Sequence, residues 1–273
     1  MKRALAFFSA FVVLAEQGAA QNTAERNATI PAANARLVQI IAGAGSLRVQ
    51  GQPGATAVSV AGQARASSDR LLSGIQLVAE PRGDVIHIEA VMPSVTSGWH
   101  FLSFGNHTAV LDLVITIPAG MAVSATDGSG DAEISGTGAL RVRDGSGSLI
   151  VEDVMGEVDI DDGSGELTVR NVTGPLTIED GSGSIRLEGV GRDVTLSDGS
   201  GEIVIRRVGN VRITSDRSGS IDIGDATGTV RVDSDGSGDI DVRNVGGDFI
   251  VERGGSGRVR YENVRGRVDV PRR

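Results

Sequence analysis

The feature that most constrains this chain is a tetrapeptide, Asp-x-Ser-Gly, that recurs at nearly constant spacing through its second half. Copies begin at Asp127, Asp144, Asp162, Asp180, Asp198, Asp216 and Asp235, with a degenerate copy at Gly254, and successive copies lie 17 to 19 residues apart. This spacing is too short for independent domains and too regular for scattered loops. Repetition at such a period is typical of solenoids, in which each repeat packs only on its neighbours.

The pattern within each repeat indicates β-strands. In the coil that begins at Asp162, aliphatic residues fall at Leu167, Val169, Leu176 and Ile178, and side chains two residues apart lie on one face of a strand. A single coil buries too little apolar surface to offset the entropy lost in ordering it. Stacked coils gain backbone ladders and continuous aliphatic columns. We therefore predict an all-β fold, a single-stranded parallel β-helix with about 18 residues per coil, which we expect to be right-handed.

Two kinds of corner are predicted in each coil. In Asp-Gly-Ser-Gly, both glycines are expected to supply positive φ, while Asp and Ser accept hydrogen bonds from turn amides. The second corner has residues that tolerate a left-handed backbone. These are Asp153, Asn171, Gly189, Asp225, Asn244 and Asn263. Arg207 is the exception, and because its coil shifts its second strand by one residue to Val211 and Ile213, we expect a local bulge there.

The chain divides into four segments by composition. Residues 1–20 have the basic start, apolar run and small-residue end of a cleavable secretory signal peptide, with a membrane anchor as the alternative. Residues 21–34 are expected to be a flexible leader, residues 35–126 irregular N-terminal coils and a cap, and residues 127–273 the regular coils. A separate small β-domain is the alternative for 35–126. These features predict a periplasmic or secreted protein, and the absence of cysteine excludes disulfides and a lipid-modified cysteine.

The charge of the chain excludes some partners. Its formal net charge is −9, and its single lysine lies in the predicted signal peptide. An acidic chain without a basic run is a poor ligand for nucleic acid or anionic lipid. No integral membrane segment is expected after signal cleavage. The expected partner is an envelope polymer or protein.

The repeats show no pattern typical of a catalytic site. No histidine follows His107 to activate the repeated serines, and uniform short coils give no sign of a cleft for paired carboxylates. We predict no catalytic residues, no enzymatic activity and no cofactor. The aspartates are interpreted as a structural turn ladder. Bridging calcium is an alternative at Asp144, Asp162, Asp180 and Asp198, although the sequence lacks the nine-residue period of calcium-binding β-rolls.

An aromatic segment around residues 97–107 stands apart from the repeats. It contains Trp99, His100, Phe101, Phe104 and His107. These residues are expected to cover one end or flank of the β-helix. The alternatives are a contact patch for a partner and metal ligation by the two histidines, for which no third ligand is evident.

The repeats Asp-Gly-Ser-Gly-x-[Ile/Leu/Val]-x-[Ile/Leu/Val], the segment Ile115-Thr-Ile-Pro-Ala-Gly120 and the earlier Gly45-Ser-Leu-Arg-Val-Gln-Gly51 together resemble the bacterial "putative adhesin" β-strand-repeat family. The resemblance covers about residues 35–270 and implies a secreted parallel β-solenoid without catalytic residues. It also implies an adhesion or interaction scaffold at the cell envelope. An accessory module of an envelope-stress sensing system and a calcium-dependent surface repeat protein are the alternative functions.

Overall fold

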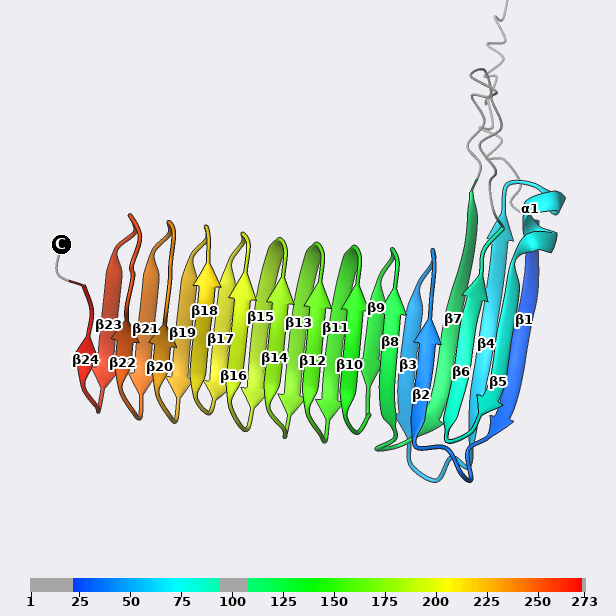
Figure 1. The fold of residues 1–273 in the computed structure, drawn as a ribbon, viewed down its shortest axis with the longest axis horizontal. Coiled ribbons are helices and arrows are strands. Elements are labelled where there is room, and N and C mark those ends of the chain that lie inside the picture. The colour runs from blue at the N-terminus through cyan, green and yellow to red at the C-terminus, as the bar shows by residue number, and fades with distance from the viewer. Residues whose placement is uncertain (1–21, 94–107, 272–273) are drawn as a thin grey trace, which may run out of the picture.

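The structure, a computed structural model, describes residues 22–93 and 108–271, which form one long stack of strands (Figure 1). The strands belong to two sheets of 12 strands each. Each regular coil contributes one strand to each sheet, so the coils are flattened and two-sided. The predicted signal peptide at 1–20 lies outside the described residues, as does the aromatic segment with Trp99, His100, Phe101, Phe104 and His107.

The regular coils confirm the predicted parallel stacking. In the first sheet they contribute β9 (Ala132–Ser135), β11 (Gly147–Val154), β13 (Gly165–Val172), β15 (Gly183–Val190), β17 (Ile203–Val208), β19 (Ile221–Ala226), β21 (Ile240–Val245) and β23 (Val259–Val264). In the second sheet they contribute β8 (Ala122–Asp127), β10 (Leu140–Asp144), β12 (Val158–Asp162), β14 (Leu176–Asp180), β16 (Val194–Asp198), β18 (Val211–Asp216), β20 (Val230–Val232), β22 (Phe249–Val251) and β24 (Val268–Asp269). Every neighbouring pair among these strands is parallel.

The core lies between the two sheets and consists of aliphatic columns. Ile160 pairs with Ile178, which pairs with Leu196 in the next coil. In the other sheet, Leu167 of β13 pairs with Ile185 of β15. All five side chains are buried, because alternate residues of each strand face inward.

The Asp-Gly-Ser-Gly corners are as tight as the sequence predicts, but their two glycines have different roles. The second glycine of each corner has a positive φ, for example 145° at Gly165, and a Cβ there would lie 1.6 Å from the carbonyl oxygen of Gly147. The first glycine has no positive φ in the described corners, and Arg217 takes its place in one coil. The expectation that both glycines supply positive φ was therefore wrong for the first one.

The opposite corners confirm the predicted left-handed positions. Positive φ occurs at Asp153, Asn171, Gly189, Asp225, Asn244 and Asn263, and also at Arg207, the exception by residue type. The bulge predicted in the coil of Arg207 is also present. Val194 pairs with Val211, 17 residues later, whereas Asp198 pairs with Asp216, 18 residues later, because the register shifts between Leu196 and Ser197. One extra residue in β18 thus restores the register before the next corner.

The N-terminal strands are not stacked in chain order. β2 (Leu37–Ile41) and β3 (Leu47–Gln52) lie directly on β8 and β9. The later strands β6 (Val85–Val91) and β7 (Ala109–Pro118) stack outside them. Residues 35–126 therefore contain two parallel coils in permuted order, together with strands that close this end of the molecule.

Antiparallel strands and a short helix close this end. β4 (Ala57–Ala66) pairs with β7 and with β1 (Asn22–Pro31), and β5 (Gln76–Arg82) pairs with β6. α1 (Asp69–Gly74) begins after Ser68, whose side chain accepts a hydrogen bond from the amide of Leu71. Because β1 occupies most of residues 21–34, the expectation of a flexible leader there was wrong. β1 is polar because it is an edge strand, and its residues alternate between half-buried and exposed along most of its length. No helix in the described part of the chain is long and apolar enough to cross a membrane.

Candidate functional site

The repeated aspartates form a row inside the stack, which we call the aspartate file. Its members are Asp127, Asp144, Asp162, Asp180, Asp198, Asp216 and Asp235. Each pairs in register with the next, from Asp127 opposite Asp144 to Asp216 opposite Asp235. Because Leu176, Ile178 and Asp180 alternate along β14, the carboxylate shares the inward face with the aliphatic side chains. The corner thus places a carboxylate at one margin of the core.

The aspartate file is almost inaccessible to solvent. Its side chains belong to residues that are only 1–7% exposed. Both carboxylate oxygens of Asp127, Asp144, Asp162 and Asp216 lack a well-formed hydrogen bond. Asp180 and Asp198 each accept one, from the amides of Ser182 and Ser200, as the turn interpretation predicts. Among the described residues, the only other buried ionisable group is His87, so no cation neutralises the file from within the core.

Burial, reinforced in several coils by the charge of a neighbouring aspartate, raises the pKa values of these carboxyl groups. Loss of solvation, reinforced by the charge of Asp127, raises the pKa of Asp144 from 3.8 to about 6. Burial together with the charges of Asp198 and Asp235 raises the pKa of Asp216 to about 7. The pKa values of the other file members are raised as well, again chiefly by burial. A protonated carboxyl can donate to its neighbour in the next coil, which relieves both effects.

The described residues of the file show no grouping of side chains suited to a metal ion. Within residues 22–93 and 108–271, no three histidine, cysteine, aspartate or glutamate side chains are grouped so that they could hold a metal ion. The residues considered for calcium, Asp144, Asp162, Asp180 and Asp198, follow one another in a single row. Calcium takes six to eight oxygen ligands around one centre, and a single row does not supply them.

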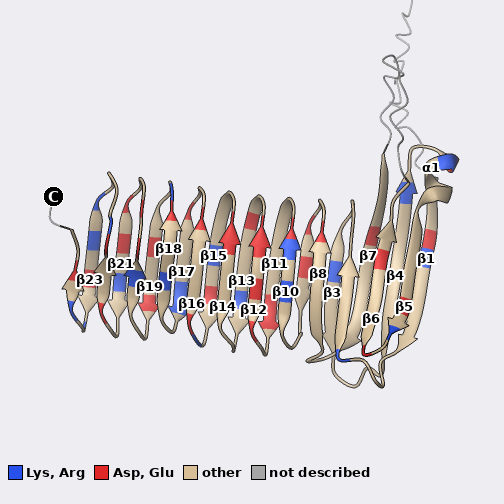
Figure 2. Cartoon of the chain, viewed as in Figure 1, with Lys and Arg blue, Asp and Glu red and all other residues tan. Residues whose placement is uncertain are grey.

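Charged residues of both signs lie on the outer faces of the regular coils (Figure 2). Most of their ion pairs join residues of neighbouring coils, and the pair Arg231–Asp233 lies within one coil. On the second sheet, Arg141 of β10 contacts Asp159 of β12 at 2.5 Å. On the first sheet, Arg170 of β13 contacts Glu152 of β11 at 2.5 Å. These ion pairs join neighbouring coils on both faces of the stack.

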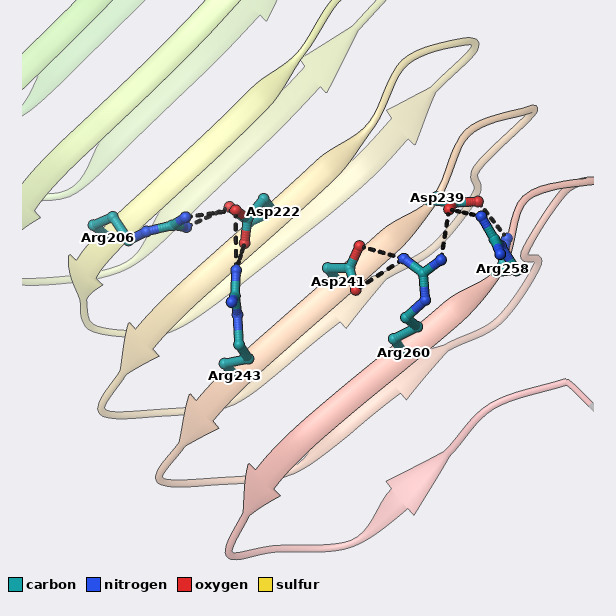
Figure 3. Close-up of polar contacts among 7 residues, drawn as sticks. All are labelled: Arg206, Asp222, Asp239, Asp241, Arg243, Arg258 and Arg260. Carbon is teal, nitrogen blue, oxygen red and sulfur yellow. Dashed lines mark hydrogen bonds and ion pairs between the residues drawn. The ribbon is translucent and has the colours of Figure 1, made fainter.

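The pairs near the C-terminal end share partners (Figure 3). Asp222 accepts from Arg206 at 2.5 Å and from Arg243 at 3.1 Å. Arg260 bridges Asp239 and Asp241 at 3.2 and 3.0 Å. Burial alone would raise the pKa of Asp222, but the hydrogen bonds and charges of the two arginines outweigh it and lower that pKa.

A shallow hollow lies along the second corner near the C-terminal end. Its volume is about 710 Å³, and it is lined by the same three positions in three successive coils, namely 225–227, 244–246 and 263–265. Asn244 donates to the side chain of Asp225, and Asn263 donates to Asn244. The lining therefore repeats with the period of the coils.

The sequence predicted the aspartates as a stacked set but missed that they face inward. The signal was present, because Asp180 follows Leu176 and Ile178 at even spacing and the same holds in neighbouring coils. The preference of aspartate for turns was enough to explain its presence at the corner. The alternation of inward and outward residues along the strand was therefore not applied to the aspartate that ends it. The buried His87, whose ring nitrogens contact Gln39 and Glu89, was also missed, since nothing in the sequence marks it.

Comparison with known proteins gives structural matches only. No family model and no curated protein matches the chain. A structure described as a "putative adhesin" from Bacteroides fragilis is similar over 92% of this chain and 98% of its own, with 13% identity and a TM-score of 0.42. Another so described, from Parabacteroides merdae, has 10% identity over 90% and 95% of the two chains and a TM-score of 0.37.

A third structure, from Parabacteroides distasonis, is described as a "putative lipid binding protein". It has 15% identity over 90% of this chain and 96% of its own, with a TM-score of 0.39. The chain is thus similar to bacterial structures of the kind that its motifs predict. At such identities and TM-scores the matches carry no argument about what this chain binds.

Proposed function

We propose that this protein is a non-enzymatic scaffold that binds an extended partner at the cell envelope through the charged outer faces of its coils. The observation that carries the proposal is the repetition of outward charged residues at the pitch of one coil. Successive strands of a sheet lie about 4.8 Å apart, so the rows present charge at a fixed spacing. A polymer or protein with its own regular repeat can contact several coils at once.

The shape of these faces supports binding over catalysis. The hollow along 225–227, 244–246 and 263–265 is open and follows the stack. A second hollow, over β10, β12 and β14, is lined by Arg141, Arg143, Asp159, Asp161 and Glu179 among others. Both extend over successive coils, which suits an elongated ligand better than a small substrate. Many weak contacts to one polymer add up to firm attachment.

We also propose that the protein acts outside the cytoplasm. The signal-like composition of residues 1–20 and the absence of cysteine favour the periplasm or the cell exterior. An envelope polymer or an envelope protein is the proposed partner, and no nucleic acid is expected, because the net charge of −9 repels it.

A sedimentation assay with purified envelope polymer tests the proposal. We expect the full mature chain to pellet with peptidoglycan sacculi. A face variant replaces Arg141 and Arg143 by Gln, Asp159 and Asp161 by Asn, and Glu179 by Gln. It keeps the shape but removes the charges, and we expect its affinity to fall by about tenfold, equivalent to ~1.4 kcal/mol.

The matched control makes the same kind of change on the cap. Glu80→Gln, Arg82→Gln and Asp84→Asn alter exposed residues of the β5–β6 hairpin and should leave retention unchanged. Thermal melting must be the same for all three proteins. Failure of the wild-type chain to bind sacculi or whole cells, or equal binding by the face variant, would refute the proposal.

A further inference from the structure

The last described coil has a strand edge in each sheet that no described strand covers. In the described part of the chain, β23 ends the first sheet and β24 ends the second. The opposite end is closed by antiparallel strands and α1 (Figure 1). Unpaired strand edges are ready templates for pairing with another chain.

The last coil exposes positions that are core everywhere else. Tyr261 pairs with Val242, so its side chain faces the interior of the stack, yet it is 51% exposed where Val242 is fully buried. Its ring contacts Phe249 with a centroid separation of 6.0 Å. Val259 pairs with the buried Ile240 and is itself only partly covered. The end of the core is therefore aromatic and aliphatic and faces solvent.

The hydrogen-bonding phase of β23 determines which backbone groups point outward. The amide of Ile240 donates to the carbonyl of Arg258 at 2.8 Å. In a parallel pair, alternate residues direct both N–H and C=O to one side. Arg258, Arg260 and Glu262 therefore bond toward β21. Val259 and Tyr261 direct their backbone groups to the open edge, and the regular alternation ends before Asn263, whose φ is positive.

We propose that a second copy of this chain docks here, with β23 antiparallel to the partner's β23 and a two-fold axis at Tyr261. This register makes Tyr261 a hydrogen-bonded pair with its own copy and continues the core across the junction. It also places Arg260 opposite the partner's Glu262, and the symmetry repeats that contact.

Charge selects this register over its neighbours. An axis at Arg260 or at Glu262 would place identical charges face to face, and an axis at Val259 would place Arg258 against the partner's Arg260. Arg260 can serve its own Asp239 and Asp241 and a further carboxylate, because a guanidinium has five N–H donors. The contact closes on itself, so it yields a dimer and not a fibre.

The dimer would double the length of the charged faces without new binding chemistry. Two collinear stacks present twice as many rows to an extended partner, which raises avidity. The inference does not depend on the proposed function, because the oligomeric state is measured without any ligand.

Sedimentation equilibrium of the full mature chain over a range of concentrations tests the proposal. We expect reversible dimers in the wild type. Tyr261→Arg places two positive charges face to face at the axis and should shift the protein to monomer. The matched control, Met155→Arg, alters another exposed apolar side chain, which is 60% exposed and lies far from the open end, and it should leave the dimer intact.

A charge-complementation experiment tests the register itself. Glu262→Arg alone and Arg260→Glu alone each place like charges across the axis, so each should be monomeric. A mixture of the two variants restores two unlike pairs and should form a heterodimer. Circular dichroism melts establish that both are folded, and Tyr261→Arg remains decisive if Arg260→Glu is not.

Three outcomes would overturn the inference. These are a wild type that stays monomeric up to millimolar concentration, a dimer that persists in both Tyr261→Arg and Glu262→Arg, and assembly into fibres. The last outcome would indicate head-to-tail stacking instead of closed pairing.

Discussion

Aspartates inside and outside the same coils behave in opposite ways. Asp162 ends β12 facing the core, while Asp161, one residue earlier, faces solvent beside Arg143. Burial raises the pKa of Asp162 to about 6, with the charges of Asp180 and Asp144 adding to the effect. Asp239, on the outer face, has its pKa lowered by the amide and side chain of Arg258. The comparison of Asp162 with Asp239 shows that the face of the strand on which a carboxylate lies decides whether its pKa is raised or lowered.

The largest expected effect comes from moving a carboxylate one inward slot away from the corner. Ile178→Asp places a charge among Ile160 and Leu196, away from the file and its proton-sharing neighbours. We expect the free energy of unfolding to fall by more than about 3 kcal/mol, measured by urea denaturation. Thr195→Asp is the control, because Thr195 faces outward beside Arg212 and should change stability by less than ~0.5 kcal/mol. A similar loss of stability in both variants would contradict the difference between inward and outward positions.

The second effect is a rise in stability on mild acidification. Asp127, Asp144, Asp162 and Asp180 have folded pKa values of about 6 and Asp216 of about 7, against 3.8 unfolded. The folded state therefore binds more protons in between. The free energy of unfolding should increase as pH falls from about 7.5 to about 4.5, by several kcal/mol in total. Urea midpoints across this range measure it. The ion pairs on the outer faces do not offset this rise. An aspartate with a lowered pKa, such as Asp222, stabilises the fold above the unfolded pKa of 3.8, and this stabilisation is lost only at lower pH. A flat profile, or one that falls toward acid, would be inconsistent with a buried file.

A smaller effect should follow from removing one charge from the file. Asp162→Asn keeps the shape and relieves repulsion on Asp144 and Asp180. We expect it to stabilise the protein at pH 8 by about 1 kcal/mol and to have little effect at pH 4.5. Asp161→Asn, which alters the outward neighbour, is the control and should not stabilise the protein at pH 8. Destabilisation by Asp162→Asn at both pH values would mean that the ionised carboxylate has a partner.

The smallest expected effect lies on the outer face. Asp222→Asn removes the shared acceptor of Arg206 and Arg243. It should cost ~0.5–1 kcal/mol, because ion pairs at the protein surface contribute little. The loss should shrink in 1 M salt, where such contacts are screened. Arg143→Gln is the control, since its contact with Asp161 is 3.9 Å long and both side chains are mostly exposed. A loss at Asp222 that does not change with salt would contradict the electrostatic interpretation.

The periodic part of this fold could be predicted from sequence because each coil repeats the same local chemistry. The left-handed Asp, Asn and Gly positions of the second corner and the bulge in the coil of Arg207 followed from spacing, whereas the positive φ of Arg207 itself did not. The permuted order of β2, β3, β6 and β7 could not be predicted, because it depends on contacts between segments far apart in the chain. β1 was missed because it is an edge strand with one face exposed to solvent. Its small and polar residues resemble those of a flexible leader.

The candidate site was predicted less well than the fold. Turn propensity explains why aspartate occurs at the corner, but it does not predict that the side chain faces the core. The ion pairs on the outer faces were predicted only in general, without their partners. Their partners depend on register between coils, since Asp222 contacts arginines from the strands on both sides of its own. Spacing fixes which residues share a row, but side-chain reach selects the partner within it.

The glycine that meets the preceding carbonyl at every corner makes the molecule modular in length. At Gly165 and Gly183 the approach is nearly identical, so each junction between windings is interchangeable with the next. Excising residues 163–180 would join Asp162 to Gly181 and recreate the junction that Asp180 now makes. A gene encoding such a chain can gain or lose whole windings while both ends stay the same, so the length of the stack is set by the number of repeats.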